Sequence, residues 1–146
     1  MARDDGVTLY KNYGKGNFQA SKILPANIRT IPISLAVTDY NKDGHVDIYV
    51  SQHTNPKYLK HNPNYVAKDI LLEGLGADAF EDVSDQTYLS KIKKDTPTQA
   101  KWLDTNNDQL PTATVGNGTE TDKFSSGDTD LITDSGHSNV SEVVST

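Results

Sequence analysis

The sequence predicts an all-β fold of short antiparallel strands, and three observations carry that prediction. Short β-rich segments alternate with turns rich in Gly, Asn and Asp, helix signals are scarce, and two markers recur at a fixed spacing. The chain has 146 residues, the length of one domain or of part of a larger one. Hydrophobic residues make up 34% of it, which is thin for an independently packed core.

The expected strands follow one another with turns between them. In chain order they are 7–10, a return strand beginning at Phe18, 33–37, 46–50, 69–73, 80–83, 99–103 and 112–115. A glycine-rich hairpin turn at 12–17 joins the first two, and a second turn at 74–78 precedes the strand at 80–83. The segment 86–94 is the one stretch with a helical pattern.

Two unrelated markers recur at nearly the same spacing and indicate a structural repeat. Gly14-x-Gly16-x-Phe18 aligns with Gly76-x-Asp78-x-Phe80 at an offset of 62 residues. Asp39-x-Asn41-x-Asp43 aligns with Asp104-x-Asn106-x-Asp108 at an offset of 65 residues. A period of about 60 residues is too long for leucine-rich or ankyrin units and suits a four-stranded propeller blade.

Charge divides the chain at about residue 116. Residues 117–146 hold six acidic residues, one basic residue and 11 Ser or Thr, and their apolar residues follow no period of 2 or 3.6. Such a segment buries too little apolar surface to offset its ordering entropy, about 1–2 kcal/mol per residue. We therefore expect a folded body over 1–116 and an acidic tail or linker over 117–146.

Composition also excludes several classes of function. The chain has no cysteine, so a disulfide scaffold, a thiolate zinc site and a cysteine nucleophile are excluded. A net charge of −6 argues against binding nucleic acid through a basic surface. No apolar run approaches the roughly 18–20 residues of a membrane span.

The loop 39–47 has the pattern of a calcium site. Oxygen donors stand at alternate positions: Asp39, Asn41, Asp43, the backbone carbonyl of His45, and Asp47. Gly44, at the sixth position, permits the sharp turn that wraps these donors around one cation. The alternative is a turn rich in Asp and Asn that holds no metal. Position 12 is Val50 rather than a bidentate Glu, and both flanks are β-rich, so the pattern predicts a strand–loop–strand site and not an EF-hand.

These residues resemble a known family. The segments 9–18 (LYKNYGKGNF) and 35–50 (LAVTDYNKDGHVDIYV) are similar to the FG-GAP/VCBS repeats, which form blades of integrin-α-like β-propellers. The resemblance extends, in weaker form, over residues 7–116. It implies about two blades' worth of strands in an incomplete propeller: the end of one blade at 7–23, a whole blade at 33–83 and the start of another at 98–116. It also implies Ca²⁺ bound by the donors of the loop 39–47.

The second loop departs from the family pattern. Asp104, Asn106 and Asp108 keep three of the donor positions, but Gln109 replaces the glycine and Thr112 replaces the last Asp. Losing one carboxylate and the permissive glycine weakens binding, so a hydrogen-bonded turn is favoured there over a second metal site.

The resemblance and the calcium loop favour a structural or adhesive module, extracellular or on the cell surface, which is not an enzyme. Expected partners are other copies of the chain or the remaining blades of a longer one, and a protein or glycan ligand. Incomplete blades at both ends predict head-to-tail self-assembly through composite blades. The alternative is a propeller fragment of a secreted carbohydrate-active enzyme or lectin, although the sequence offers no acid–base constellation that points to catalysis.

Overall fold

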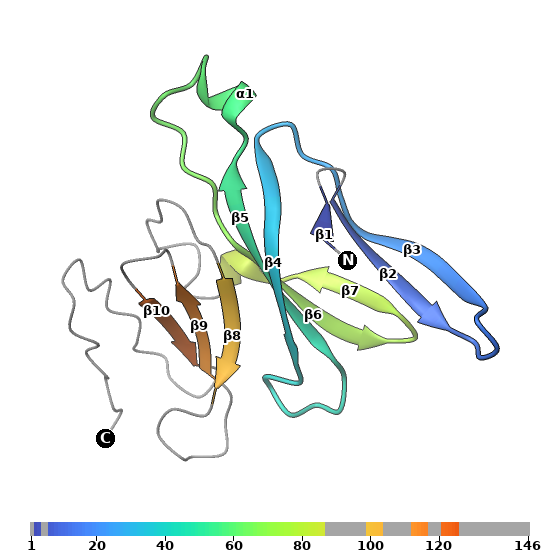
Figure 1. Cartoon of the computed structure of the whole chain (residues 1–146). Helices are drawn as coiled ribbons and strands as arrows, with labels where there is room; N and C mark the ends of the chain where they lie inside the picture. Colours follow the sequence, from blue (N-terminus) through green and yellow to red (C-terminus); the bar gives the residue numbers. More distant parts are fainter. Residues whose placement is uncertain (1, 4–5, 87–98, 104–111, 117–120, 126–146) are drawn as a thin grey trace, which may run out of the picture.

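The computed structural model describes residues 2–3, 6–86, 99–103, 112–116 and 121–125, which form three antiparallel sheets (Figure 1). The order of strands within each sheet follows their order in the chain. A four-residue helix and one 3₁₀ turn are the helical elements of the described residues. The all-β prediction is therefore confirmed.

The first sheet contains β1 (Ala2–Arg3), β2 (Gly6–Asn12) and β3 (Phe18–Pro25). β2 and β3 form the expected hairpin, whose turn holds Gly14 and Gly16 at φ values of 87° and 77°. Glycine reaches these values without the steric cost that a Cβ atom brings. β1 pairs with β2 at only two positions.

The middle sheet is a complete four-stranded unit. It contains β4 (Thr30–Thr38), β5 (Asp47–Thr54), β6 (Ile70–Gly76) and β7 (Ala79–Asp82), in this order. This confirms the four-stranded unit expected over 33–83. The loop 39–46, which carries most of the candidate calcium ligands, joins β4 to β5.

The turn between β6 and β7 is shorter and more strained than the sequence indicates. β6 continues to Gly76, which pairs with Ala79, so only two residues form the turn. Both of them, Ala77 and Asp78, have positive φ values, 50° and 64°. This is the type I′ geometry, which favours Asn and Gly, and residues with a Cβ atom lose about 1–2 kcal/mol each in the left-handed region.

The third sheet contains β8 (Gln99–Leu103), β9 (Thr112–Gly116) and β10 (Thr121–Ser125). β8 and β9 are the strands expected there. β10 lies within the segment 117–146 that the sequence assigns to a tail, and it pairs with β9 at five positions. Backbone pairing needs no apolar period, which is why the search for periodicity missed this strand. The remainder of that segment, 126–146, lies outside the described residues.

Two short helical elements lie around the middle sheet. Helix α1 (Pro56–Leu59) follows β5, and the side chain of Asn55 caps it by accepting a hydrogen bond from the backbone N–H of Lys57. Pro56 stands at the first helical position, where its missing N–H costs nothing. The 3₁₀ turn η1 (Ser84–Gln86) follows β7. The helix expected at 86–94 lies outside the described residues after Gln86.

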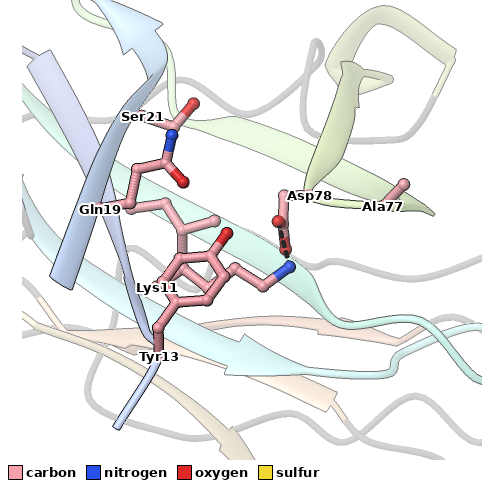
Figure 2. A pocket seen from close by; sticks show the side chains of 7 residues that line it. Lys11, Tyr13, Gln19, Ser21, Ala77 and Asp78 are labelled. Carbon is pink, nitrogen blue, oxygen red and sulfur yellow. Dashed lines mark hydrogen bonds and ion pairs between the residues drawn. The ribbon is translucent and has the colours of Figure 1, made fainter. Parts of the chain in front are cut away.

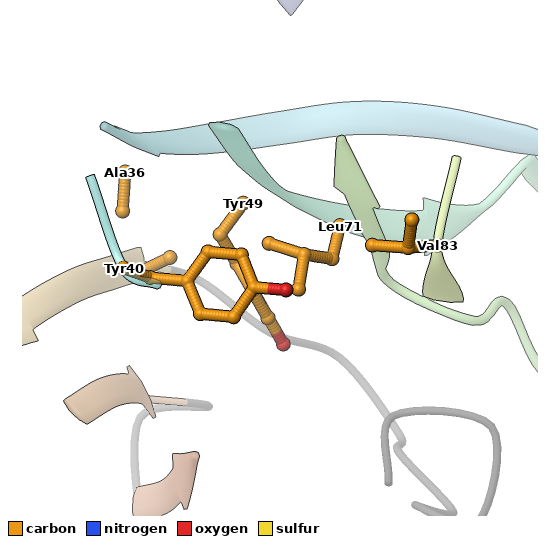
Figure 3. Packing of buried hydrophobic residues seen from close by; sticks show 6 residues of the cluster. Ala36, Tyr40, Tyr49, Leu71 and Val83 are labelled. Atoms are coloured by element: carbon orange, nitrogen blue, oxygen red, sulfur yellow. The ribbon is translucent and has the colours of Figure 1, made fainter. Parts of the chain in front are cut away.

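The two central strands of the middle sheet, β5 and β6, are buried on both faces. On one face, a cluster of buried residues joins the middle sheet to β8 of the third sheet (Figure 3). Its members are Ala36, Tyr40, Tyr49, Leu71, Val83 and Ala100, with Trp102 packed beside them. The opposite cluster packs against the first sheet and consists of Val7, Ile48, Val50 and Leu72, with Ile23, Leu24, Leu35, Ile70 and Phe80 beside them. Successive residues of β5 and β6 thus face alternate neighbours, as the period of two in a strand requires.

Candidate metal centre

The loop 39–46 folds back on itself through its own acidic side chains. The two carboxylate oxygens of Asp39 accept hydrogen bonds from the backbone N–H groups of Asp43 (3.1 Å) and Gly44 (2.9 Å). Gly44 has a φ of 89°, so the turn needs the residue that the sequence pattern identified. The first expected ligand therefore closes the loop around its sixth position.

Two more expected ligands make short-range turns inside the loop. The side-chain oxygen of Asn41 accepts from the backbone N–H of Asp43 at 3.1 Å, and the Asp43 carboxylate accepts from that of His45 at 2.8 Å. The amide of Asn41 also donates to Asp43 at 3.1 Å. These side chains are drawn together on one small loop, as both the calcium prediction and its alternative, a metal-free Asx-rich turn, require.

Asp47, the last expected ligand, lies at the first position of β5 and is fully buried. Its two carboxylate oxygens accept from the backbone N–H groups of Tyr40 and Gly74, both at 2.8 Å. Burial raises the pKa of this carboxyl, while these two hydrogen bonds lower it, and the charges of Asp43 and Asp39 raise it further. The carboxylates of Asp39 and Asp43 are therefore close enough to repel that of Asp47, and a bound cation would offset that repulsion.

Two glycines of β6, Gly74 and Gly76, leave the space in which the end of the loop packs against this strand. A Cβ atom on Gly74 would lie 2.3 Å from the carbonyl oxygen of Val46, which is closer than any real Cβ contact. A Cβ atom on Gly76 would lie 3.0 Å from the imidazole ring of His45. The ring of His45 is thus packed against β6, in keeping with the expectation that this residue offers its backbone carbonyl and not its side chain.

Tyr40 connects the loop to the third sheet. Its hydroxyl donates to the Glu73 carboxylate at 3.0 Å, and its ring stacks on Trp102 of β8 with centroids 6.1 Å apart and planes 15° apart. Burial, the hydrogen bond to Glu73 and the nearby carboxylates all raise the pKa of this hydroxyl, so it stays protonated as a donor. Trp102 also meets Tyr49 edge-on, at 6.2 Å between centroids.

The donor chemistry of the loop fits Ca²⁺. Calcium takes six to eight oxygen ligands, and the loop offers three carboxylates, one amide oxygen and a backbone carbonyl. A carboxylate oxygen has two lone pairs, so accepting one N–H leaves it another for a cation. In the described part of the chain, no three His, Cys, Asp or Glu side chains are already arranged around a common metal position. The second loop, with Asp104, Asn106 and Asp108, lies outside the described residues.

One family model matches part of the chain. Residues 1–50 match the FG-GAP-like repeat family. This segment of 50 residues, out of 146, is therefore similar to an FG-GAP-like repeat. No curated protein and no solved structure matches the chain.

The segment that matches the FG-GAP-like repeat extends over two sheets of the structure. Residues 1–50 cover the whole first sheet, then β4, the candidate metal loop and the first half of β5. One repeat in the sequence therefore ends one sheet and begins the next. The repeat includes all five expected ligand positions, from Asp39 to Asp47.

The sequence located the loop but missed what surrounds it. Gly74, Glu73 and Trp102 belong to other strands, and nothing in their own sequence context connects them with the loop. Tyr40 offered a weak signal, because it is a large aromatic residue in a mostly polar loop, although Tyr13, in another loop, is exposed. Its partners follow only from the way the sheets stack.

Proposed function

We propose that the chain is a calcium-stabilised β-repeat module of an extracellular protein, which binds other molecules and catalyses no reaction. The observation that carries the proposal is the way in which the loop 39–46 and the adjoining Asp47 are held against β6. Asp39 and Asp43 fold the loop through hydrogen bonds to its own backbone, and the adjoining Asp47 at the start of β5 is buried with its carboxylate bonded to Tyr40 of the loop and Gly74 of β6. Without a cation, these carboxylates repel one another; bound Ca²⁺ would attract each of them and outweigh that repulsion.

The bound cation would stabilise more than the loop. Tyr40 takes part in three contacts at once: with Asp47 through its backbone, with Glu73 through its hydroxyl and with Trp102 through its ring. A loop fixed by Ca²⁺ therefore holds the ring that packs against the third sheet. We infer that calcium strengthens the contact between the middle and third sheets.

The test uses the single tryptophan of the chain, Trp102, as the reporter. Adding Ca²⁺ to chelator-treated protein should raise the melting temperature and change the Trp102 emission, because Trp102 stacks on a residue of the loop. Binding to the folded state alone stabilises by about 2.7 kcal/mol at a hundredfold excess of Ca²⁺ over its Kd. Asp43→Asn should abolish both responses.

The matched control is Asp85→Asn, the same chemical change at an exposed position in η1. It should leave both responses intact. A wild-type protein whose melting temperature and emission ignore Ca²⁺ and chelator alike would remove the metal centre from the proposal. Mg²⁺ serves as a second control, because its small octahedral shell suits such a flexible oxygen-rich loop poorly.

The proposed location follows from the family and from the affinity expected of the loop. FG-GAP repeats are typical of extracellular proteins. Extracellular modules work with sites whose Kd is as weak as about 10⁻⁴–10⁻³ M, because the surrounding Ca²⁺ keeps them filled. No helix in the described part of the chain is long and apolar enough to cross a bilayer.

We also propose that other β-sheets cover the flanking sheets, either from further copies of the chain or from the remaining blades of a longer one. The offset of 62 residues aligns β2 and β3 with β6 and β7, and the offset of 65 aligns β8 and β9 with β4 and β5. Among the described residues, the first sheet thus lacks a counterpart of β4 and the third lacks one of β7. Each flanking sheet is an incomplete blade.

Head-to-tail assembly would join β8 and β9 of one copy to β2 and β3 of the next. β10 already occupies the place beside β9, so this arrangement requires it to move aside. Light scattering on the full chain tests the idea: concentration-dependent oligomers, capped at short lengths when residues 1–23 are deleted, support it. A monomer at every concentration leaves the blades of a longer chain as the partners.

A lectin or a propeller of a secreted carbohydrate-active enzyme is the second candidate. The open cavity between the first and middle sheets favours the lectin form of this alternative. An assay for release of unsaturated products from acidic polysaccharides separates a lyase from a binding module, since binding alone releases none.

A further inference from the structure

A cavity of about 250 Å³ opens between the hairpin of the first sheet and the turn that joins β6 to β7 (Figure 2). Its lining comes from both sheets and consists of Leu9, Lys11, Tyr13, Gln19, Ser21, Ala77 and Asp78. Pockets for drug-sized ligands measure roughly 300–1,000 Å³, so this one has room for a single small ring.

The wall formed by the hairpin is one face of a regular antiparallel pair. Leu9 stands opposite Ser21, and Lys11 stands opposite Gln19, so these four side chains leave the same side of the sheet. Tyr13 follows at the end of β2, with 57% of its surface exposed. The wall therefore offers an aromatic ring, an amide, a hydroxyl and an ammonium on one side of the hairpin, all lining the same cavity.

The opposite wall is the strained two-residue turn. Its Asp78 carboxylate lies 2.5 Å from the ammonium of Lys11, and the two side chains are 42% and 46% exposed. The same ammonium lies 5.8 Å from the centre of the Tyr13 ring. The hydrogen bond to Asp78, together with its charge, raises the pKa of Lys11, so the ammonium stays protonated at neutral pH. An exposed ion pair of this kind adds little stability, so it does not explain why the strained turn is kept.

The chemistry of the lining selects the class of ligand. Lys11 and Asp78 cancel in charge, so neither an anion nor a cation gains from entering, while together they offer donors beside an acceptor. Gln19 adds both a donor and an acceptor, and Tyr13 adds an exposed ring face for C–H groups. A hydrophobic ligand would displace water from these polar groups without replacing its hydrogen bonds.

We propose that this cavity binds one neutral sugar ring of a glycan, with Tyr13 as the stacking surface and with Lys11, Asp78 and Gln19 bonding its hydroxyl groups. The inference rests on the proposed function of the chain as a binding module, and it adds the position of the site and the class of ligand. It needs no contact with the metal loop.

The experiment titrates the full chain, in the presence of Ca²⁺, with methyl glycosides of glucose, galactose, mannose and N-acetylglucosamine. Amide chemical shifts in NMR spectra report the site of binding. We expect at least one of these sugars to shift resonances of β2, β3 and the β6–β7 turn. Galacturonate and choline, one anionic and one cationic, should produce no saturable shift.

Three variants and a matched control locate the site. Tyr13→Ala should weaken binding about tenfold, the loss of one aromatic contact, whereas Tyr13→Phe should restore most of it. Gln19→Ala should weaken binding without changing the melting temperature, since the side chain is exposed. Tyr10→Ala is the control, because Tyr10 is also exposed on β2 but alternates to the opposite face of the strand.

Three outcomes overturn the inference: no neutral sugar shifts these resonances, the charged ligands bind equally well, or Tyr10→Ala weakens binding as much as Tyr13→Ala. The metal centre is judged separately by Trp102 emission. If Trp102 responds to Ca²⁺ and no sugar binds, only the saccharide site fails. If a sugar binds but Ca²⁺ has no effect, only the metal centre fails.

Discussion

Gly74 shows how much one residue controls the candidate metal centre. Its backbone N–H holds the buried carboxylate of Asp47, and the space where a side chain would stand is filled by the carbonyl of Val46. Both contacts fix the point where the loop returns to β5. Any side chain at this position must push the loop away from β6.

We therefore expect Gly74→Ala to lower the free energy of unfolding by about 1–3 kcal/mol, the usual cost of overpacking, and to weaken the calcium response as well. The control is Gly14→Ala. Nothing lies within 4 Å of a Cβ atom there, so its cost comes from the φ of 87° alone, about 1 kcal/mol. Denaturant unfolding with and without Ca²⁺ measures both effects. An unchanged calcium response in Gly74→Ala would contradict the conclusion that the packing of the loop against Gly74 supports the metal centre.

At the scale of the element, β5 is the strand on which the rest of the fold depends. Its apolar residues alternate between the two clusters, and Tyr49 and Val50 are both fully buried on opposite faces. The Tyr49 hydroxyl also donates to the Asp69 carboxylate at 2.6 Å. One strand thus joins three sheets.

Tyr49→Ala should lower the free energy of unfolding by about 3–5 kcal/mol, because it removes a large buried ring from the cluster beside Trp102. Tyr49→Phe separates the two contributions, since it keeps the ring and loses only the hydrogen bond to Asp69, worth about 1.5–3 kcal/mol with a charged acceptor. Thermal and denaturant melts give the values. Equal losses in the two variants would mean that the hydrogen bond, and not the ring, supports this cluster.

The sequence predicted elements well where local pattern decides them. The β-rich run 46–50 and the glycine pair of 14–16 located a strand and a hairpin because both signals lie within a few neighbouring residues. β10 was missed, since its pairing with β9 leaves no apolar pattern in its own residues. The loop 39–47 was recognised because its oxygen donors are neighbours in the sequence. Its contacts with Gly74 and Trp102 were missed because they depend on how the strands pair and the sheets stack.

At the scale of the whole molecule, β10 separates two parts of the acidic segment. Deleting 126–146 should leave the melting temperature and the calcium response unchanged, because this deletion keeps every described strand. Deleting 117–146 also removes β10 and leaves the edge of β9 unpaired, which invites association with another copy.

Melting curves and light scattering on the two truncated chains test this difference. We expect only the longer deletion to lower the melting temperature and to increase the scattering. If both chains behave like the full chain, β10 contributes nothing to the third sheet. If both lose stability, residues beyond Ser125 support the fold, and the tail is not dispensable.

Burial of the central strands on both faces also determines the order in which segments of the protein open to solvent. Amide hydrogens exchange with solvent when a segment opens, and segments that bury the most apolar surface open last. β5 cannot be exposed unless a neighbouring sheet first moves away, whereas β2 and β3 have one face that no described element covers. Hydrogen–deuterium exchange should therefore label the hairpin of 6–25 early and the strand of 47–54 last, and a protein that is pulled or heated would lose its flanking sheets before its centre.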